Sequence, residues 1–194
     1  MPHEKVLIII GKHICLRQFR DGDLGWWRRA LMQNAWARWD APWETRITRA
    51  ELRVMVERAR ALARQRALPP NRMVIETRAG TPIGTVSRYW VDARTEWLEV
   101  GIGIYNGRRW GRGYGTEAFA LWIDYLFDAM GLRRIGLRTW SGNVRMARLA
   151  RRLGFKQEAT FREAYVSRTR RYDRVAFGLL RRECKHARRT WPVS

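Results

Sequence analysis

Helical spacing of apolar residues is the strongest pattern in the chain, and it predicts about four helices. The clearest case puts Phe119, Trp122 and Ile123 on one stripe, because residues three or four positions apart share a helix face. Thr48 and Glu51 have the spacing of a capping box, which marks the start of a helix. The predicted helices cover residues 23–32, 48–65, 116–130 and 143–153.

Short apolar runs, several of them alternating with polar residues, predict strands between turn-forming residues. Gly11-Lys12 and Ala79-Gly80 each separate two such runs, so each is expected to form the turn of a hairpin. Residues 36–43 hold three tryptophans and a proline, and they cannot form one continuous helix. The predicted strands cover residues 6–10, 13–19, 72–77, 82–89, 97–105, 134–139, 157–165 and 172–180.

The order of these elements predicts the fold class. Antiparallel strands come first, and the strand–helix–strand unit that follows implies a right-handed crossover and a locally parallel pair. We therefore expect an α/β (α+β) fold with a mixed, mainly antiparallel sheet of about seven strands and helices on both faces. Nothing in the sequence resembles a linker, so one domain is expected over residues 1–194, with a basic C-terminal tail over residues 181–194.

The charge of the chain is strongly positive, with 39 lysines and arginines against 18 acidic residues, a formal net charge of +21. Such a charge favours encounters with polyanions, including coenzymes, nucleic acid and the ribosome. The basic residues are scattered, which argues against a dedicated nucleic-acid-binding arm and leaves weak, non-specific attraction.

Composition also bounds the location of the protein. The apolar run at residues 6–10 is too short to cross a membrane, and Cys15 and Cys184 lack the spacing of a disulfide framework or a zinc site. We expect a cytoplasmic protein, a monomer or homodimer, that has no membrane contact and binds no metal.

Residues 110–117, Trp-Gly-Arg-Gly-Tyr-Gly-Thr-Glu, join the predicted strand at 97–105 to the predicted helix at 116–130. Closely spaced glycines let several backbone N–H groups converge on an anion, and a helix N-terminus adds a favourable potential. The patterns of a P-loop and of a dinucleotide-binding loop are absent from the sequence. The loop is therefore predicted to hold a different phosphate compound, the alternative being a plain tight connection.

Three motifs follow one another between residues 97 and 180. They are Val100-Gly101-Ile102-Gly103-Ile104, the glycine loop with Ala118 after it, and Asn143-x-x-Met146 running into Arg152-Leu153-Gly154-Phe155. Together they resemble the GCN5-related N-acetyltransferase (GNAT) superfamily, in the Rim-type branch of ribosomal-protein N-alpha-acetyltransferases. The resemblance implies the GNAT fold and transfer of the acetyl group of acetyl coenzyme A (acetyl-CoA) to a primary amine, either a protein N-terminus, as of a ribosomal protein, or a small amine.

By this resemblance, the coenzyme-binding residues lie on the strand, the loop and the second helix of the motif. The loop amides and an arginine would hold the pyrophosphate, and Asn143 would steady the pantetheine, unless it is only a helix N-cap. Arg108-x-x-Gly111-x-Gly113 offers a second register of the loop motif. The full expected set is Ile102, Gly103, Ile104, Arg108, Trp110, Gly111, Arg112, Gly113, Tyr114, Gly115, Thr116, Asn143 and Met146.

Glu99 is the leading candidate for the general base. Alternation puts it on the strand face of Gly101 and Gly103, where the absence of side chains leaves room beside the carboxylate. Direct transfer needs a neutral amine, and the pKa of an alkyl amine is about 10.4, so a base or a water must remove a proton. Glu96 and Asp92 are the reserve candidates. Alternatively, Glu99 is a surface residue paired with an arginine.

The proton for the leaving thiolate has less clear candidates. Tyr165 and Tyr172 are expected either to donate it or to be packing aromatics, and Ala150 stands where other branches of the family have a tyrosine. Backbone N–H groups on a bulged strand near Ile102 are expected to stabilise the oxyanion.

Trp36, Trp39 and Trp43 are expected to form walls of the acceptor site, since aromatic rings can orient an amine. Their alternative role is to cover the core or to contact a second copy. A second hypothesis for the whole protein is a catalytically weak coenzyme-binding module that binds nucleic acid or the ribosome through its arginines.

Overall fold

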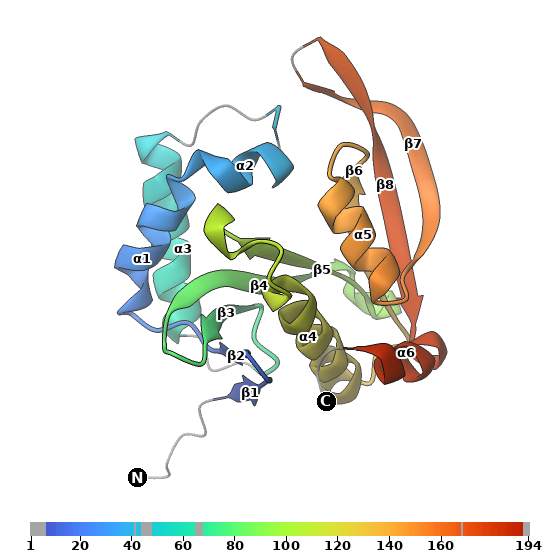
Figure 1. The fold of residues 1–194 in the computed structure, drawn as a ribbon, viewed down its shortest axis with the longest axis horizontal. Coiled ribbons are helices and arrows are strands. Elements are labelled where there is room, and N and C mark those ends of the chain that lie inside the picture. The colour runs from blue at the N-terminus through green and yellow to red at the C-terminus, as the bar shows by residue number, and fades with distance from the viewer. Residues whose placement is uncertain (1–6, 41, 44–47, 65–67, 168, 192–194) are drawn as a thin grey trace.

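The fold is built around a single mixed sheet (Figure 1). In the computed structural model, residues 7–40, 42–43, 48–64, 68–167 and 169–191 are described. The eight strands lie in the order β1-β2-β3-β4-β5-β6-β8-β7, and only β5 and β6 pair in parallel. The strands are β1 Ile8–Ile10, β2 Ile14–Arg17, β3 Arg72–Thr77, β4 Pro82–Asp92, β5 Trp97–Ile104, β6 Arg134–Trp140, β7 Lys156–Ser167 and β8 Arg170–Leu180.

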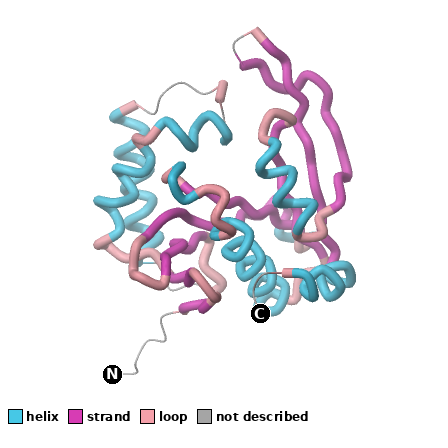
Figure 2. Tube along the Cα trace, in the orientation of Figure 1, coloured by secondary structure: helices cyan, strands magenta, loops and turns pink. Residues whose placement is uncertain are grey.

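Over the described residues, six α-helices flank this sheet (Figure 2). The predicted α+β class and the mainly antiparallel sheet are confirmed. The helices are α1 Asp23–Leu31, α2 Asn34–Asp40, α3 Arg49–Arg64, α4 Tyr114–Met130, α5 Val144–Arg152 and α6 Arg181–Ala187. None of the helices in the described part of the chain is both long and apolar enough to cross a membrane.

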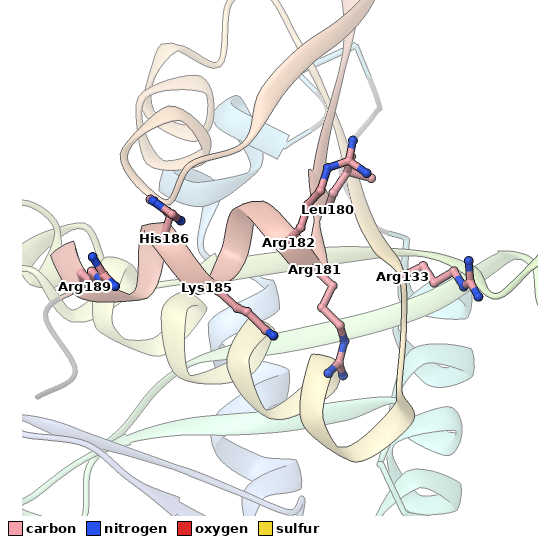
Figure 3. Close-up of a pocket in the computed structure, with 7 residues that line it drawn as sticks. All are labelled: Arg133, Leu180, Arg181, Arg182, Lys185, His186 and Arg189. Atoms are coloured by element: carbon pink, nitrogen blue, oxygen red, sulfur yellow. The ribbon is translucent and has the colours of Figure 1, made fainter.

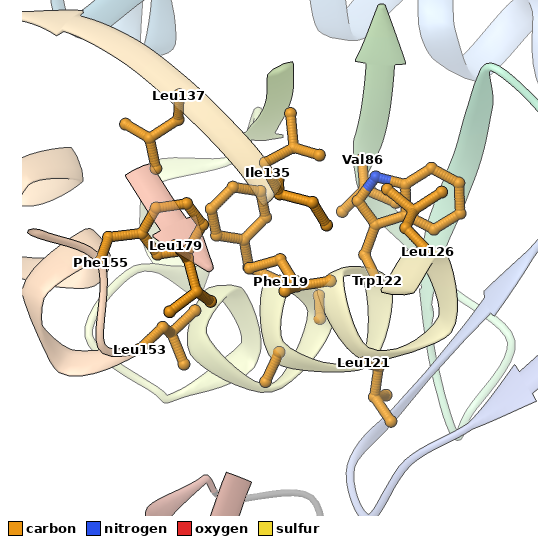
Figure 4. Close-up of a cluster of buried hydrophobic side chains, with 14 of the residues drawn as sticks. Val86, Phe119, Leu121, Trp122, Leu126, Ile135, Leu137, Leu153, Phe155 and Leu179 are labelled. Atoms are coloured by element: carbon orange, nitrogen blue, oxygen red, sulfur yellow. The ribbon is translucent and has the colours of Figure 1, made fainter. Parts of the chain in front are cut away.

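The largest core lies where α4 packs against the sheet. Phe119, Trp122 and Leu126 are fully buried and point from α4 towards Val86 of β4 and Ile135 of β6 (Figure 4). This is the apolar stripe that helical spacing predicts, and burying such side chains drives the packing of α4. A second, smaller core, which includes Phe19, Trp27 and Tyr105, joins α1 and α3 to the opposite face of the sheet.

Glu117 fixes the N-terminal turn of α4 to the start of β2. Its buried carboxylate accepts hydrogen bonds from the backbone N–H groups of His13 (2.8 Å) and Ile14 (3.3 Å) and lies 3.0 Å from the His13 Nδ1. A carboxylate in the first turn also suits the positive end of the helix dipole. The loop that precedes α4 is therefore held against the sheet from its helical side.

The structure differs from the expectations at two places that matter below. The helix after the glycine loop begins at Tyr114, two residues before the expected Thr116, and Gly113 is its N-cap residue. The expected basic tail is part of the domain over the residues described: α6 and a short 3₁₀ turn, Arg188–Thr190, pack on the core through buried Cys184 and Trp191. Residues 192–194 lie outside the described part, as do Val6 and Gln65 at the ends of two predicted elements.

Candidate active site

The strands β5 and β6 separate shortly after they meet. Their parallel pairing consists of Leu98 with Ile135 and Glu99 with Gly136. Beyond these pairs β5 continues to Ile104 and β6 to Trp140, each bonded to its other neighbour instead. One edge of β5 therefore lacks a strand partner from Val100 onwards, and its backbone groups are available to a ligand.

The glycine loop lies at the far end of this unpaired edge. Gly111 and Gly113, the two glycines of the second register, have φ values of +76° and +84°, which side-chain-bearing residues rarely adopt. No heavy atom lies within 4 Å of the position that a Cβ would take at either glycine. Among the described residues, the amides from Gly111 to Thr116 donate no hydrogen bond within the protein, whereas Glu117 N–H bonds to Gly113.

Two contacts hold the loop in place beside β5. The Trp110 indole N–H donates to the Ile104 carbonyl oxygen (2.8 Å), and Asn106 Oδ1 accepts from the Arg108 amide (2.9 Å). Gly115 lies in the first turn of α4, where its Cβ position is 3.8 Å from Ile104 and 3.9 Å from Ile102. Arg108 and Arg112 are exposed beside the free amides. The expected loop residues are thus gathered at the N-terminus of α4, at the end of β5.

Glu99 lies where β5 and β6 separate, and it is buried, with 2% of its surface exposed. Arg138 Nε donates to its Oε2 at 2.5 Å, and the Tyr89 hydroxyl donates to the same oxygen at 2.8 Å. Gly136 faces Glu99 closely, since a Cβ there would come within 3.1 Å of Glu99 Cγ. Glu99 is therefore a buried group in a network, and its Oε1 has no hydrogen-bond partner among the described residues.

Tyr89 was missed by sequence reasoning, although it is directly opposite Glu99 in the β4–β5 pairing. Burial, together with the charge and the hydrogen bond of Glu99, raises the pKa of Tyr89 to about 12. The phenol therefore keeps its proton at neutral pH. A register counted from the hairpin turn would have put Trp90 opposite Glu99, because the irregularity between Trp90 and Asp92 shifts the pairing by one residue. Arg138 depends on the parallel pairing, which no local pattern reveals.

Tyr165 and Tyr172 are paired across the β7–β8 hairpin and belong to an aromatic cluster. Trp43 stacks on Tyr165 with 4.0 Å between ring centroids, and Trp140 contacts Tyr172 edge-on at 4.8 Å. Strand alternation puts this cluster on the sheet face of Glu99, but Trp140 is four residues beyond Gly136 on β6, about 13 Å. Both tyrosines pack as aromatics here, and their catalytic role stays a prediction.

The three tryptophans of residues 36–43 lie in three different surroundings. Trp36 on α2 contacts Tyr105 edge-on at 5.5 Å and belongs to the second core, and Trp43 belongs to the aromatic cluster described above. Trp39 lies between Trp36 and Trp43 in the sequence. The Arg145 guanidinium carbon is 4.9 Å from the centre of the Trp39 ring and 4.6 Å from the centre of the Trp110 ring. Trp39, through its carbonyl oxygen, and Trp43, through its ring, therefore contact Trp140 at the end of β6, whereas Trp36 packs in the second core.

Asn143 has a structural task in this arrangement. Its Oδ1 accepts from the Met146 amide (3.0 Å) and so caps α5, while its Nδ2 donates to the Trp39 carbonyl oxygen (2.6 Å). Met146 packs on the α4 core from α5. Ala150, at the position of the relatives' tyrosine, is fully buried, so position 150 faces the core. The N-cap role of Asn143 is confirmed, and its contact with a coenzyme stays a prediction.

The bulge expected near Ile102 is not observed. The β4–β5 pairing is regular from Leu98 to Ile104, and its one irregularity lies between Trp90 and Asp92 at the other end of the hairpin. In this regular stretch, Gly101 and Gly103 of β5 lie opposite Ser87 and Thr85 of β4. Asp92 and Glu96, the reserve candidates for the general base, lie at that same end of the hairpin. Asp92 is bound by Arg94, and Glu96 is exposed.

The residues present fit a coenzyme with a diphosphate and an amide-containing arm. Six consecutive loop amides are free for phosphate oxygens, and the adjacent edge of β5 can pair with amide groups as an added strand does. A separate cavity of about 750 Å³ lies elsewhere, beside α6. No group of three or more His, Cys, Asp or Glu side chains suited to a metal ion occurs among the described residues.

Known proteins share both the sequence pattern and the fold. The family model described as an acetyltransferase (GNAT) domain matches residues 13–156. The uncharacterized N-acetyltransferase p20 of Bacillus licheniformis is 32% identical over 101 residues, which cover 52% of this chain and 56% of that protein. The match to the curated relatives thus spans about half their length.

Two solved structures have the same fold at low sequence identity. The ribosomal-protein-S5-alanine acetyltransferase of Vibrio fischeri has a TM-score of 0.73 and 20% identity, covering 90% of this chain and 96% of that one. The spermidine N-acetyltransferase of Vibrio cholerae, in complex with CoA and spermine, has a TM-score of 0.70 and 20% identity, covering 89% and 98%. Since the family model covers well over half of the sequence, this chain belongs to the GNAT acetyltransferase family.

Proposed function

We propose that the protein is an acetyl-CoA-dependent N-acetyltransferase of the Rim-type branch, whose acceptor is the α-amine of a polypeptide. The observation that carries the proposal is the continuous path from the free amides of the glycine loop, along the unpaired edge of β5, to the buried carboxylate of Glu99. Family membership and the resemblance of the loop motif to that branch support it.

The coenzyme would supply the acetyl group as a thioester, and the protein supplies binding and proton handling. The free amides of residues 111–116 and the exposed Arg112 would hold the diphosphate, because aligned N–H groups and a guanidinium favour anionic oxygens. Ile102, Gly103 and Ile104 offer the unpaired backbone edge for the amide-containing arm. Unpaired amides on this edge also suit developing negative charge on an acyl oxygen.

Glu99 would take up the acceptor proton, directly or through a water. Arg138 and Tyr89 both hold Oε2, which leaves Oε1 as the atom that can accept from the amine. Less proton removal is needed for an acceptor that is already partly neutral, and the pKa of an α-amine, about 7.7–8.0, is lower than that of an alkyl amine, about 10.4.

Charge also favours a polypeptide acceptor over a polyamine. The net charge of +21 repels a polycation during encounter. On the sheet face shared by β4, β5 and β6, Arg138 neutralises the carboxylate of Glu99, and Arg94 binds that of Asp92. The aromatic cluster around Trp43 and Trp140 would line the path of the residues that follow the acceptor amine.

A thiol-release assay with purified protein and acetyl-CoA tests this proposal. The acceptors are peptides with a free or a blocked N-terminus, spermidine and an aminoglycoside. We expect release with free N-termini, none with blocked ones and little with spermidine. Preference for spermidine would contradict the acceptor, and no release with any acceptor would contradict the activity.

The same assay tests Glu99 through Glu99→Gln, with Glu96→Gln as the matched control on an exposed glutamate of the same hairpin. We expect Glu99→Gln to lower kcat about 10²–10⁴-fold, the usual contribution of a general base, and Glu96→Gln to leave kcat unchanged. Thermal protection by CoA should be equal in both variants. An unchanged kcat in Glu99→Gln would remove Glu99 from proton transfer.

A further inference from the structure

An open groove lies beside α6, and its lining is almost wholly basic. Its volume is about 750 Å³, and Leu180 is the one apolar residue that lines it. Figure 3 shows the basic side chains along α6 and the turn after it, with Arg133 on the chain just before β6. The basic residues of the groove are Arg133, Arg181, Arg182, Lys185, His186 and Arg189.

The carboxylates around α6 are already paired with cations outside the groove. Glu183 binds Lys156 (2.7 Å), Glu158 binds Arg134 (2.6 Å), and Asp124 and Asp128 both bind Arg188. Within the described residues, the groove cations have no carboxylate partner. Four of them, Arg133, Arg182, Lys185 and Arg189, also donate no side-chain hydrogen bond there. Their charge is thus available to an external anion.

The groove cations stand on ordered backbone. Cys184 and Trp191 are buried beneath α6 and the following turn, with 1% and 3% exposure. Arg181 fixes the helix to the end of α4 by donating to the carbonyl oxygens of Leu132 (3.0 Å) and Phe127. Because the backbone is already ordered by these contacts, less conformational entropy is lost when an anion binds.

The groove is separate from the coenzyme loop. The loop precedes the first residue of α4, whereas Leu132 and Arg133 follow its last residue, and α4 is 17 residues long. At 1.5 Å per residue, Arg133 is about 25 Å from the loop, while Asp124, which binds Arg188 beside the groove, is about 15 Å from it. A phosphate compound held by the loop amides therefore leaves the groove cations free.

We propose that this groove binds the phosphodiester backbone of a nucleic acid duplex. Arginine forks match phosphate oxygens in pairs, and the several unpaired cations suit a ligand with regularly spaced charges. The groove lining lacks aromatic residues, so it offers no stacking for unpaired bases. Leu180 alone is too little apolar surface for insertion into a lipid bilayer. Binding is thus to the backbone and independent of base sequence.

Fluorescence anisotropy with labelled 20-base-pair duplexes of RNA and of DNA, over a range of salt concentrations, tests the proposal on the full chain. The test variant carries Arg133→Gln, Arg182→Gln, Lys185→Gln and Arg189→Gln. The control variant carries Arg28→Gln, Arg29→Gln, Arg53→Gln and Arg58→Gln, which remove equal charge from exposed positions on α1 and α3. Thermal melting verifies that both variants are folded.

We expect the groove variant to bind at least one duplex tenfold or more weakly and the control to bind within about threefold of the wild type. The slope of log affinity against log salt should become shallower by about 3 to 4 in the groove variant, near 0.9 for each phosphate that the variant no longer neutralises. Equal weakening in both variants, or none in either, would overturn the proposal.

Binding measurements with two further ligands test whether the groove binds a duplex backbone or any anion. Vesicles with anionic lipid and a polyglutamate peptide carry negative charge without a duplex backbone. We expect the groove variant to bind both as the control variant does. If the groove substitutions weaken vesicle or peptide binding and leave duplex binding unchanged, the proposal is wrong. Acetyl transfer to a short peptide with a free N-terminus should be equal in both variants, which separates this proposal from the proposed enzymatic function.

Discussion

The chemistry of Glu99 depends on which of its two oxygens is occupied. Arg138 and Tyr89 share Oε2, so the carboxylate is fixed in orientation while Oε1 stays available. A buried, paired carboxylate of this kind is costly to place unless its hydrogen bonds are made. The close approach of Gly136 shows how the sequence makes room for it, since a larger residue at position 136 would collide with the Glu99 side chain.

Cys184 offers a test of how firmly α6 packs over the core. Burial raises the pKa of its thiol from 9.0 to about 11. At pH 8 the folded protein therefore has about a hundredfold fewer Cys184 thiolates than an ordinary cysteine would give. In Cys15→Ser protein, where Cys184 is the only thiol, we expect labelling by an aromatic disulfide reagent to be slow until denaturant is added.

The direction of the pH effect follows from the raised pKa. The protonated thiol favours the folded state, so its contribution is complete below pH 9 and is lost as the pH rises through about 11. The labelling rate of folded Cys15→Ser should therefore climb across that range. Cys184→Ser protein, which keeps the half-exposed Cys15, serves as the comparison. Fast labelling of Cys184 at pH 8 without denaturant would contradict the packing of α6.

The alternation of residues along the strand predicts on which face of the sheet Glu99 lies, but not which side chains bind its carboxylate. Leu98 and Val100 are buried on the α4 side, while Glu99 faces the opposite side, as a period of two requires. Tyr89 and Arg138 come from strands whose register is set by tertiary pairing. The role of Trp39 was similarly out of reach, because its contacts with Arg145 and Asn143 join segments about 100 residues apart.

The glycine loop is the element whose conformation matters most to the proposed function. Gly113 lies at φ +84°, and Gly80, in the β3–β4 turn, lies at φ +76°, with open space at both Cβ positions. Alanine at either position has the same backbone strain, about 1–2 kcal/mol. The two glycines are therefore a matched pair for separating strain from coenzyme binding.

We expect Gly113→Ala and Gly80→Ala to lower the free energy of unfolding by similar amounts in urea denaturation. Only Gly113→Ala should weaken CoA binding, by about tenfold or more in calorimetric titration, because the loop amides lose their common direction. Equal CoA affinity in the two variants would show that the loop is a tight connection and not a phosphate site.

Most helices and strands were predictable from the sequence because their patterns are local. The stripe of α4, the capping box of α3 and the strand β3 all occur where spacing places them. The helix α6 was not predicted, because five of its seven residues are basic or acidic and only Cys184 is buried. Its packing depends on Trp191 and on carbonyl groups of α4, which no local pattern contains.

Charge is distributed over the molecule so that the two proposed anion sites lie at opposite ends of α4. The loop before Tyr114 offers amides and a helix N-terminus, and the groove after Met130 offers side-chain cations. The first arrangement suits a compact diphosphate, while the second suits an extended polyanion. The net charge of +21 draws either ligand to the protein, and local geometry decides where each one binds.

Hydrogen–deuterium exchange with and without CoA tests the central claim most directly, because it reports on the loop amides themselves. With saturating CoA, we expect slower exchange in a peptide spanning residues 107–118 and along β5 from Val100 to Ile104, and no change over residues 181–191. Unchanged exchange in the loop, or protection confined to residues 181–191, would contradict the assignment of the glycine loop as the coenzyme site.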